Sequence, residues 1–116
     1  AHKYSGKKIV IYGTGLIFQV VADNYDLSKL NIIAVSDRKY LYHPQESFYG
    51  RKTISPIQIY TLEPDLILLS TNYTYIIKDF LEEKIGINTN KIKIESLVPK
   101  SIREWIEDYI ISNITE

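Results

Sequence analysis

The hydrophobic positions along the chain change their period repeatedly, which predicts strands that alternate with helices. Residues 8–12 and 31–36 are apolar and rich in β-branched side chains, so each predicts a strand. Residues 65–70 contain a continuous apolar run, which is typical of a strand buried on both faces. Residues 92–95 predict a fourth strand, and residues 52–54 a short extended piece.

Helical spacing of apolar residues appears between these strands. It predicts a helix at about residues 15–26 whose apolar face contains Leu16, Ile17, Val20, Val21 and Tyr25. A second helix, at about residues 72–85, is expected to end at Gly86 and to bury Tyr73, Ile76, Ile77, Phe80 and Leu81. The sequence Ser55-Pro56-Ile57-Gln58 has the capping residues that open a short helix.

A capping box at residues 101–104 opens a last helix, at about residues 101–114. Its apolar face would contain Ile102, Trp105, Ile106, Tyr109 and Ile110. Docking of this face on the sheet is the favoured interpretation. A homodimer or a neighbouring domain is the alternative, because tyrosine and tryptophan are enriched at such surfaces.

Alternating strands and helices predict an α/β fold. We expect a three-layer, Rossmann-like parallel sheet of about four to five strands, with helices on both faces. Numbered along the chain, the four main strands should lie in the order 2-1-3-4, with right-handed crossovers. The 116 residues form one domain. Position 1 is not Met, so we expect a processed start or a piece of a longer protein.

This strand order reverses its winding between strands 1 and 3, and ligands of such sheets bind at that point, outside the carboxyl ends of the strands. Three loops meet there. Their residues are the candidate binding residues: Gly13, Thr14, Gly15, Leu16, Asp37, Arg38, Ser70, Thr71 and Asn72.

Each loop has a physical reason to bind a nucleotide. The glycines allow a close approach to the backbone, and the helix that follows them offers free N–H groups to a phosphate. Asp37 lies about 20 residues beyond Gly15, near the spacing at which an acid reaches a ribose. The alternatives are a glycine turn without a ligand, an ordinary turn residue at Asp37, and helix-capping roles for Ser70 and Asn72.

The full dinucleotide fingerprint G-x-G-x-x-G is not present, because Phe18 stands at its third glycine. The chain also corresponds to about one mononucleotide-binding half. A complete dehydrogenase is therefore not expected. We assign no catalytic residue, since His43 is the only histidine besides His2 and no sequence neighbour pairs with it. One usable histidine and no cysteine cannot form a closed zinc site, so no metal site is expected.

The composition of the chain argues against several classes of binding partner. The formal net charge is +0, from 14 basic and 14 acidic residues, so nothing supports nucleic-acid binding. No apolar run has the length of a membrane span. The absence of cysteine, with no visible leader, favours the cytoplasm. The aromatic residues Tyr40, Tyr42, Phe48 and Tyr49 crowd the loop after residue 36, where packing is favoured over stacking on a base.

Four segments carry a family resemblance: Lys8–Gly15, Gln19–Asp23, Ile32–Asp37 and Gly50–Pro56. Together they resemble the N-terminal nucleotide-binding domain of bacterial sugar O- and N-acetyltransferases of the sialic-acid and bacillosamine type. They are also similar to accessory modules of enzymes that build surface polysaccharides. The resemblance implies that Gly13, Gly15 and Asp37 hold a UDP-sugar, while the catalytic domain of those transferases has no counterpart in this chain.

The sequence therefore predicts a domain that binds a nucleotide or nucleotide-sugar in a bacterial surface-carbohydrate pathway and is not catalytic alone. A UDP-sugar is the favoured ligand. Two alternatives stay open: the NAD-binding part of a sugar epimerase or dehydrogenase, and an interaction module with an empty crevice.

Overall fold

The computed structural model describes residues 4–24, 26–43, 47–71 and 74–96. Within them, a six-stranded sheet has the order β3-β4-β2-β1-β5-β6. The strands are β1 (Ile9–Tyr12), β2 (Ile32–Ser36), β3 (Ser47–Phe48), β4 (Arg51–Ile54), β5 (Leu66–Leu69) and β6 (Lys93–Ser96). All neighbouring strands are parallel except β3 and β4, which form an antiparallel hairpin at one edge.

The α/β class is confirmed, but the sheet is larger than predicted and is mixed. The expected four to five parallel strands did not include β3, which is two residues long, and residues 52–54 were expected only as a short extended piece. These residues belong to β4, which pairs with β2 through Val35 and Thr53 and extends the sheet beyond the predicted edge. Local pattern missed β3 because two residues cannot display a period.

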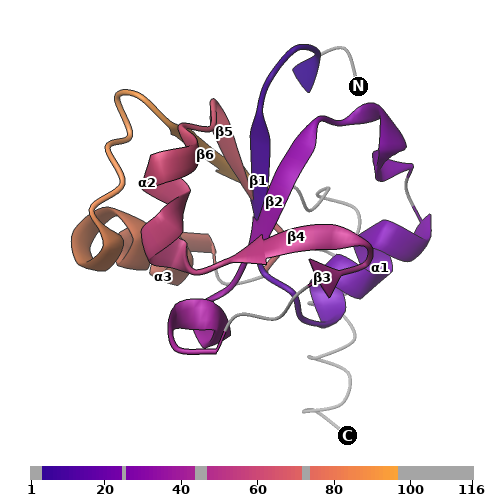
Figure 1. Ribbon diagram of the computed structural model, residues 1–116, viewed down its shortest axis with the longest axis horizontal. Helices are drawn as coiled ribbons and strands as arrows, with labels where there is room; N and C mark the ends of the chain where they lie inside the picture. The colour runs from indigo at the N-terminus through magenta and orange to yellow at the C-terminus, as the bar shows by residue number, and fades with distance from the viewer. Residues whose placement is uncertain (1–3, 25, 44–46, 72–73, 97–116) are drawn as a thin grey trace, which may run out of the picture.

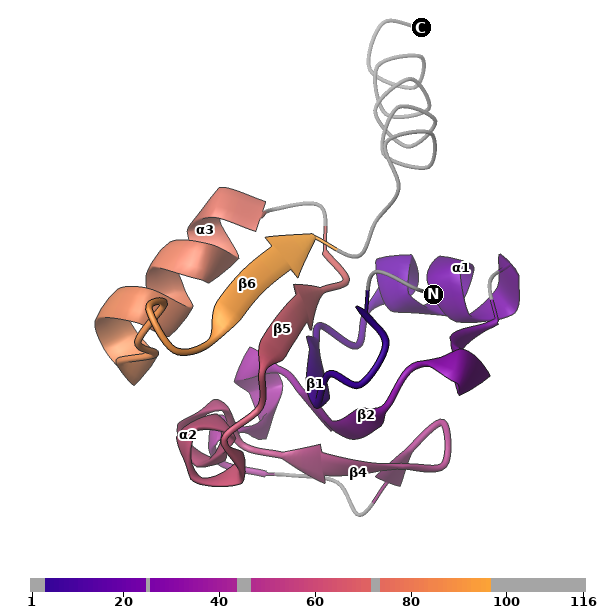
Figure 2. The ribbon, with the colours of Figure 1, turned by 90° about the horizontal axis from the view of Figure 1, so that it is seen from above.

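Helices cover both faces of the sheet, as Figure 2 shows. On one face lie α1 (Leu16–Asn24) and the short 3₁₀ helix η2 (Leu27–Lys29). On the other face lie α2 (Ile59–Leu62) and α3 (Thr74–Asp79), which continues as the π-helical turn η5 (Phe80–Ile85). Two further 3₁₀ helices, η3 (Arg38–Leu41) and η4 (Pro56–Gln58), complete the described helices (Figure 1).

Two hydrophobic cores follow from the alternation of side chains along the strands. Ile9 and Ile11 of β1 face α1, together with Phe18 and Val21 of that helix. The residues between them face the other way: Val10 and Tyr12 pack with Leu81 of η5. The strand β5 is buried at all four positions, as its continuous apolar run predicted.

The helix ends show which local predictions were accurate. The capping box at Ser55 is present, with Gln58 reaching back to the backbone N–H of Ser55 at 2.9 Å. Gly86 ends η5 in the left-handed conformation, as predicted. The predicted helical faces were partly wrong, since Leu16 and Ile76 are 73% and 67% exposed. The expected last helix, at 101–114, lies outside the described residues, as do Tyr25 and Tyr73.

Candidate functional site

The glycine turn after β1 is fixed to the ends of both neighbouring strands. The N–H of Gly13 donates to the carbonyl oxygen of Ser36, at the end of β2, over 2.9 Å. On the other side, the N–H of Ser70 donates to the carbonyl oxygen of Tyr12 over 2.9 Å. Three strand ends are thereby held together at the carboxyl edge of the sheet.

Gly13 is required at its position by geometry. Its φ is +115°, which side chains rarely adopt, and a Cβ there would lie 3.0 Å from both the carbonyl oxygen and the hydroxyl of Ser70. The Ser70 hydroxyl donates to the carbonyl oxygen of Gly13 at 2.6 Å. Gly15 differs, because its φ is ordinary and a Cβ there would meet no atom of the described residues within 4 Å. It is therefore an exposed position where a side chain can be added.

Asp37 binds the turn. Its Oδ2 accepts hydrogen bonds from the N–H and the hydroxyl of Thr14, at 2.8 and 2.9 Å. Its Oδ1 accepts from the N–H of Lys39 at 3.1 Å and caps η3. Thr14 itself is buried. The sequence spacing found Asp37 as a candidate but did not reveal this bond across the two loops, which only the pairing of β1 with β2 creates.

Two buried tyrosines lie beside Asp37. The hydroxyl groups of Tyr12 and Tyr40 are buried and have no well-aligned hydrogen-bond partner among the described residues. Burial raises the pKa of Tyr12 far above its ordinary value; the charge of Asp37 adds to the rise and that of Arg38 opposes it. Burial also raises the pKa of Tyr40, opposed by nearby Thr14 and assisted by Asp37. Polar groups buried without a partner are rare and indicate a special environment.

The helix α1 begins directly after the turn. The first backbone hydrogen bond of this helix runs from the N–H of Gln19 to the carbonyl oxygen of Gly15. The N–H groups of residues 15–18 therefore have no partner within the helix. Leu16, at the first position, is 73% exposed. Phe18 does not block this end: its ring is buried and packs against Phe48 and Tyr49, with centroids 5.1 and 5.3 Å away.

The structure thus brings most of the predicted binding residues to one edge. Gly13, Thr14, Asp37 and Ser70 are linked by the hydrogen bonds given above. Arg38 is exposed, and its guanidinium lies over the ring of Phe80, 5.1 Å from the centroid. Thr71 follows Ser70 and is half-buried. Asn72 lies outside the described residues, so its role stays a prediction.

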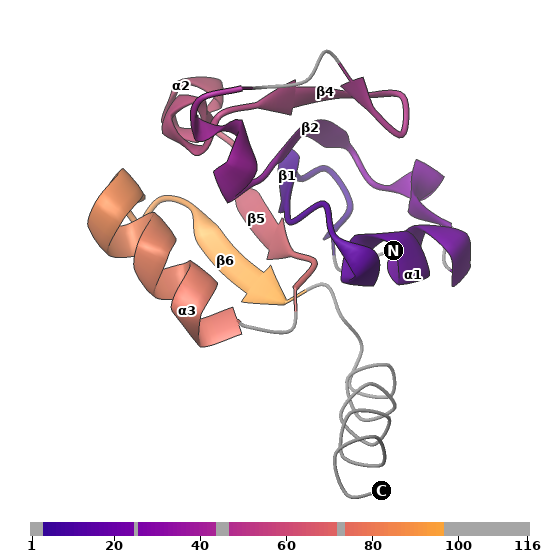
Figure 3. The same ribbon diagram turned by 90° about the horizontal axis from the view of Figure 1, so that it is seen from below.

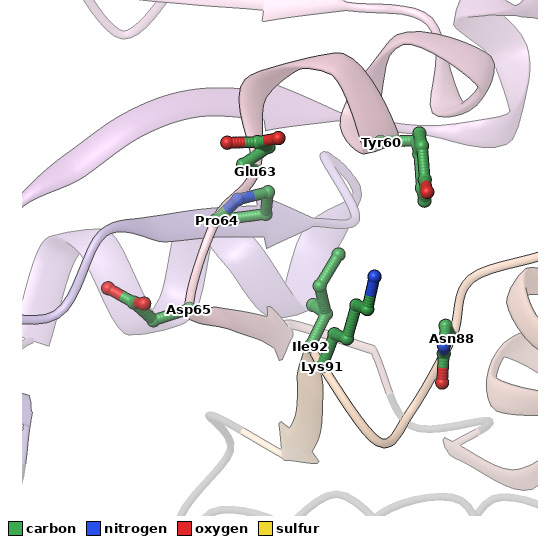
Figure 4. Close-up of a pocket in the computed structure, with 7 residues that line it drawn as sticks. All are labelled: Tyr60, Glu63, Pro64, Asp65, Asn88, Lys91 and Ile92. Carbon is green, nitrogen blue, oxygen red and sulfur yellow. The ribbon is translucent and has the colours of Figure 1, made fainter.

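A second polar region lies at the opposite edge of the sheet, at the amino ends of β5 and β6. It is a pocket of about 190 Å³, lined by Tyr60, Glu63, Pro64, Asp65, Asn88, Lys91 and Ile92. Figure 4 shows the carboxylates of Glu63 and Asp65 on one side, and Tyr60, Lys91 and Asn88 on the other. The sequence patterns did not indicate this pocket, because its lining comes from two segments that are distant in the chain, residues 60–65 and 88–92.

Neither a metal centre nor a membrane-spanning helix is found among the described residues. No group of histidine and acidic side chains is arranged to hold a metal ion within residues 4–24, 26–43, 47–71 and 74–96. None of the helices in this part of the chain has the length and hydropathy for crossing a bilayer.

Comparison with known proteins identifies a family but no ligand. None of the curated proteins matches this chain. The resemblance to sugar acetyltransferase domains stays a prediction. Residues 5–93 match the family described as C2185-like, N-terminal, and this region covers most of the chain and all of the site described above. The chain therefore belongs to the C2185-like, N-terminal family.

Proposed function

We propose that this domain binds a nucleotide or nucleotide-sugar at the carboxyl edge of its sheet, for a bacterial surface-carbohydrate pathway, without catalysing a reaction alone. The observation that carries the proposal is the convergence of Gly13, Thr14, Asp37 and Ser70 at the reversal of winding between β1 and β5. Ligands of open α/β sheets occupy this place. The favoured ligand is a UDP-sugar, as the acetyltransferase resemblance implies.

The hydrogen bonds of the turn restrict where a phosphate can lie. The N–H of Thr14 is already bonded to the carboxylate of Asp37, which would repel a phosphate at that point. The N–H groups of residues 15–17 come next along the chain and point from the start of α1, where the helix dipole favours an anion. We therefore assign the phosphate to Gly15, Leu16 and Ile17.

Asp37 can accept one ribose hydroxyl in addition to its present bonds. Each carboxylate oxygen has two lone pairs. Both lone pairs of Oδ2 are taken by Thr14, and one of Oδ1 is taken by the N–H of Lys39. The remaining position on Oδ1 supports a single hydrogen bond to the ribose, whereas binding of both hydroxyls would require the turn to rearrange.

Isothermal titration calorimetry with UDP, a UDP-sugar, NAD and pyrophosphate tests the proposal. We expect UDP and the UDP-sugar to bind and Gly15→Val to abolish binding, because its side chain would cover the start of α1. Gly15→Val should still fold, because a Cβ at this position has no neighbour within 4 Å in the described part of the chain. Its unfolding transition checks this.

Two controls make the result specific. Gly15→Ala adds only a methyl group and should retain most of the affinity. Lys91→Ala alters the pocket at the opposite edge and should leave binding unchanged. Unchanged binding by Gly15→Val would exclude the start of α1 as the phosphate site. Tight binding of NAD alone would instead favour the epimerase or dehydrogenase alternative, and no binding of any probe would favour the interaction module.

A further inference from the structure

A cleft of about 360 Å³ lies on the α3 face of the sheet, next to the candidate site. It is lined by Arg38, Ile76, Asp79, Phe80, Glu83 and Lys84. One wall comes from η3, which begins directly after Asp37, and the other from α3 and η5. Figure 3 shows these elements on the same side of the sheet, opposite α1. The charges of Asp37 and Arg38 both act on the buried phenol of Tyr12, so the cleft and the carboxylate share one neighbourhood.

The walls of this cleft suit a flat aromatic ring. The guanidinium of Arg38 lies over the ring of Phe80, 5.1 Å from its centroid, which holds one face of the guanidinium in place. Arg38 is an exposed residue, so part of its side chain is accessible to a ligand. Ile76 adds an apolar side chain that is 67% exposed. Arginine planes and apolar side chains of this kind stack on nucleobases.

The charges of the cleft argue against a second phosphate. Arg38 and Lys84 carry positive charge, while Asp79 and Glu83 carry negative charge, so the formal charges cancel. A phosphate would be repelled by the two carboxylates, whereas the edge of a nucleobase presents both donors and acceptors. The lining contains matching partners for both: carboxylates that accept and cationic groups that donate.

We propose that this cleft holds the nucleobase of the ligand, with Arg38 acting as a stacking surface rather than as a phosphate ligand. The inference rests on the proposed function, because the ribose at Asp37 places the base beside Arg38. It goes further by placing the base against Arg38, in the cleft lined by residues of η3, α3 and η5.

The test compares UMP with ribose 5-phosphate, which has the same phosphate and ribose but no base, by calorimetry on the wild type and two variants. UMP should bind the wild type at least about tenfold more tightly, the order expected for one stacked base. Arg38→Ala and Ile76→Asp should each lower the affinity for UMP several-fold and leave that for ribose 5-phosphate unchanged. Both side chains are exposed, so both variants should fold, which thermal unfolding checks.

Ile57→Asp is the matched control, since Ile57 is 64% exposed and lies outside the cleft. It should bind both probes like the wild type. Equal affinity of the wild type for UMP and ribose 5-phosphate would overturn the proposed base site while leaving the proposed function standing. An equal loss of both probes in Arg38→Ala would also overturn it, because Arg38 would then bind the phosphate. Failure of both probes to bind the wild type would overturn both proposals.

Discussion

The two edges of the sheet both carry polar side chains, but they hold them differently. At the carboxyl edge, Thr14 and Ser70 are buried, and their hydrogen bonds connect loops that are far apart in sequence. At the amino edge, the pocket residues Glu63 and Lys91 are exposed, and Asn88 bonds locally to the N–H of Asn90 at 3.0 Å. Asp65 is the exception, since its carboxylate accepts from the N–H of Lys8 at 2.8 Å.

This difference gives a physical reason to prefer one edge over the other as the candidate site. The amino edge has a clear pocket, but its polar groups are solvated, so they carry little desolvation free energy. At the carboxyl edge, burying polar groups is expensive unless each is bonded, and two tyrosine hydroxyls there have no well-aligned partner within the described part of the chain. We therefore favour the carboxyl edge as the functional one, and the following predictions test the contrast in order of expected effect.

The largest effect is expected at Gly13. Gly13→Ala should lower the free energy of unfolding by about 3–5 kcal/mol, from backbone strain combined with overpacking against Ser70. The cause is a Cβ placed 3.0 Å from two Ser70 atoms at a φ of +115°. Urea denaturation measures the change.

Gly50→Ala is the control for Gly13→Ala, because Gly50 also has a positive φ, +72°, but a Cβ there meets nothing within 4 Å. It should cost about 1 kcal/mol. Similar losses in the two variants would contradict the close packing of the turn against Ser70.

The second prediction compares one aspartate from each edge. Asp37→Ala removes the acceptor of three hydrogen bonds and leaves the buried Thr14 groups unpaired, so it should cost about 2–3 kcal/mol. Asp65→Ala removes the acceptor of one exposed bond and should cost about 1 kcal/mol or less. Chemical denaturation of both variants gives the comparison, and equal losses would remove the distinction between the two edges.

The third prediction concerns the buried phenol of Tyr12. Its pKa is raised above the ordinary value of 10.0, so the folded state keeps its proton where the unfolded state loses it. Stability is then fully present below pH 10 and falls as pH rises towards the folded pKa, by about 1.4 kcal/mol per pH unit. Tyr12→Phe removes this contribution.

Urea denaturation of the wild type and Tyr12→Phe between pH 9 and about pH 11 gives the difference in unfolding free energy between the two proteins. The contributions of the other titrating groups cancel in this difference. The wild type should lose stability relative to the variant as pH rises. Tyr42→Phe, at a position that is 84% exposed, is the control for loss of a phenol. A constant difference between wild type and Tyr12→Phe would show that the phenol is not held in a desolvated place.

The smallest effect is expected at the amino edge. Lys91→Ala should change the unfolding free energy by no more than about 0.5 kcal/mol, as for most exposed positions. Thermal unfolding measures it. A loss comparable to that of Asp37→Ala would mean that the pocket in Figure 4 is part of the cooperative structure and not a solvated depression.

Local signals predicted the elements that are governed by local physics. The capping box at Ser55 and the end of a helix at Gly86 depend on backbone groups a few residues apart, so the sequence contains them completely. The apolar run of β5 likewise indicated burial on both faces. The short β3 and the exposed positions of Leu16 and Ile76 were missed, because pairing and neighbouring elements decide them.

The candidate site also has features that the sequence predicted and features that only the tertiary structure decided. The sequence by itself determined which residue types stand at the ends of the strands: Gly13 and Gly15 in the turn, Asp37 after β2, and Ser70 after β5. Only the tertiary structure decided that Asp37 bonds Thr14 and that Ser70 bonds Gly13, and it alone placed Arg38 over Phe80. The physical reason is that these contacts join strands through sheet pairing, whose partners are distant in the chain and carry no local pattern.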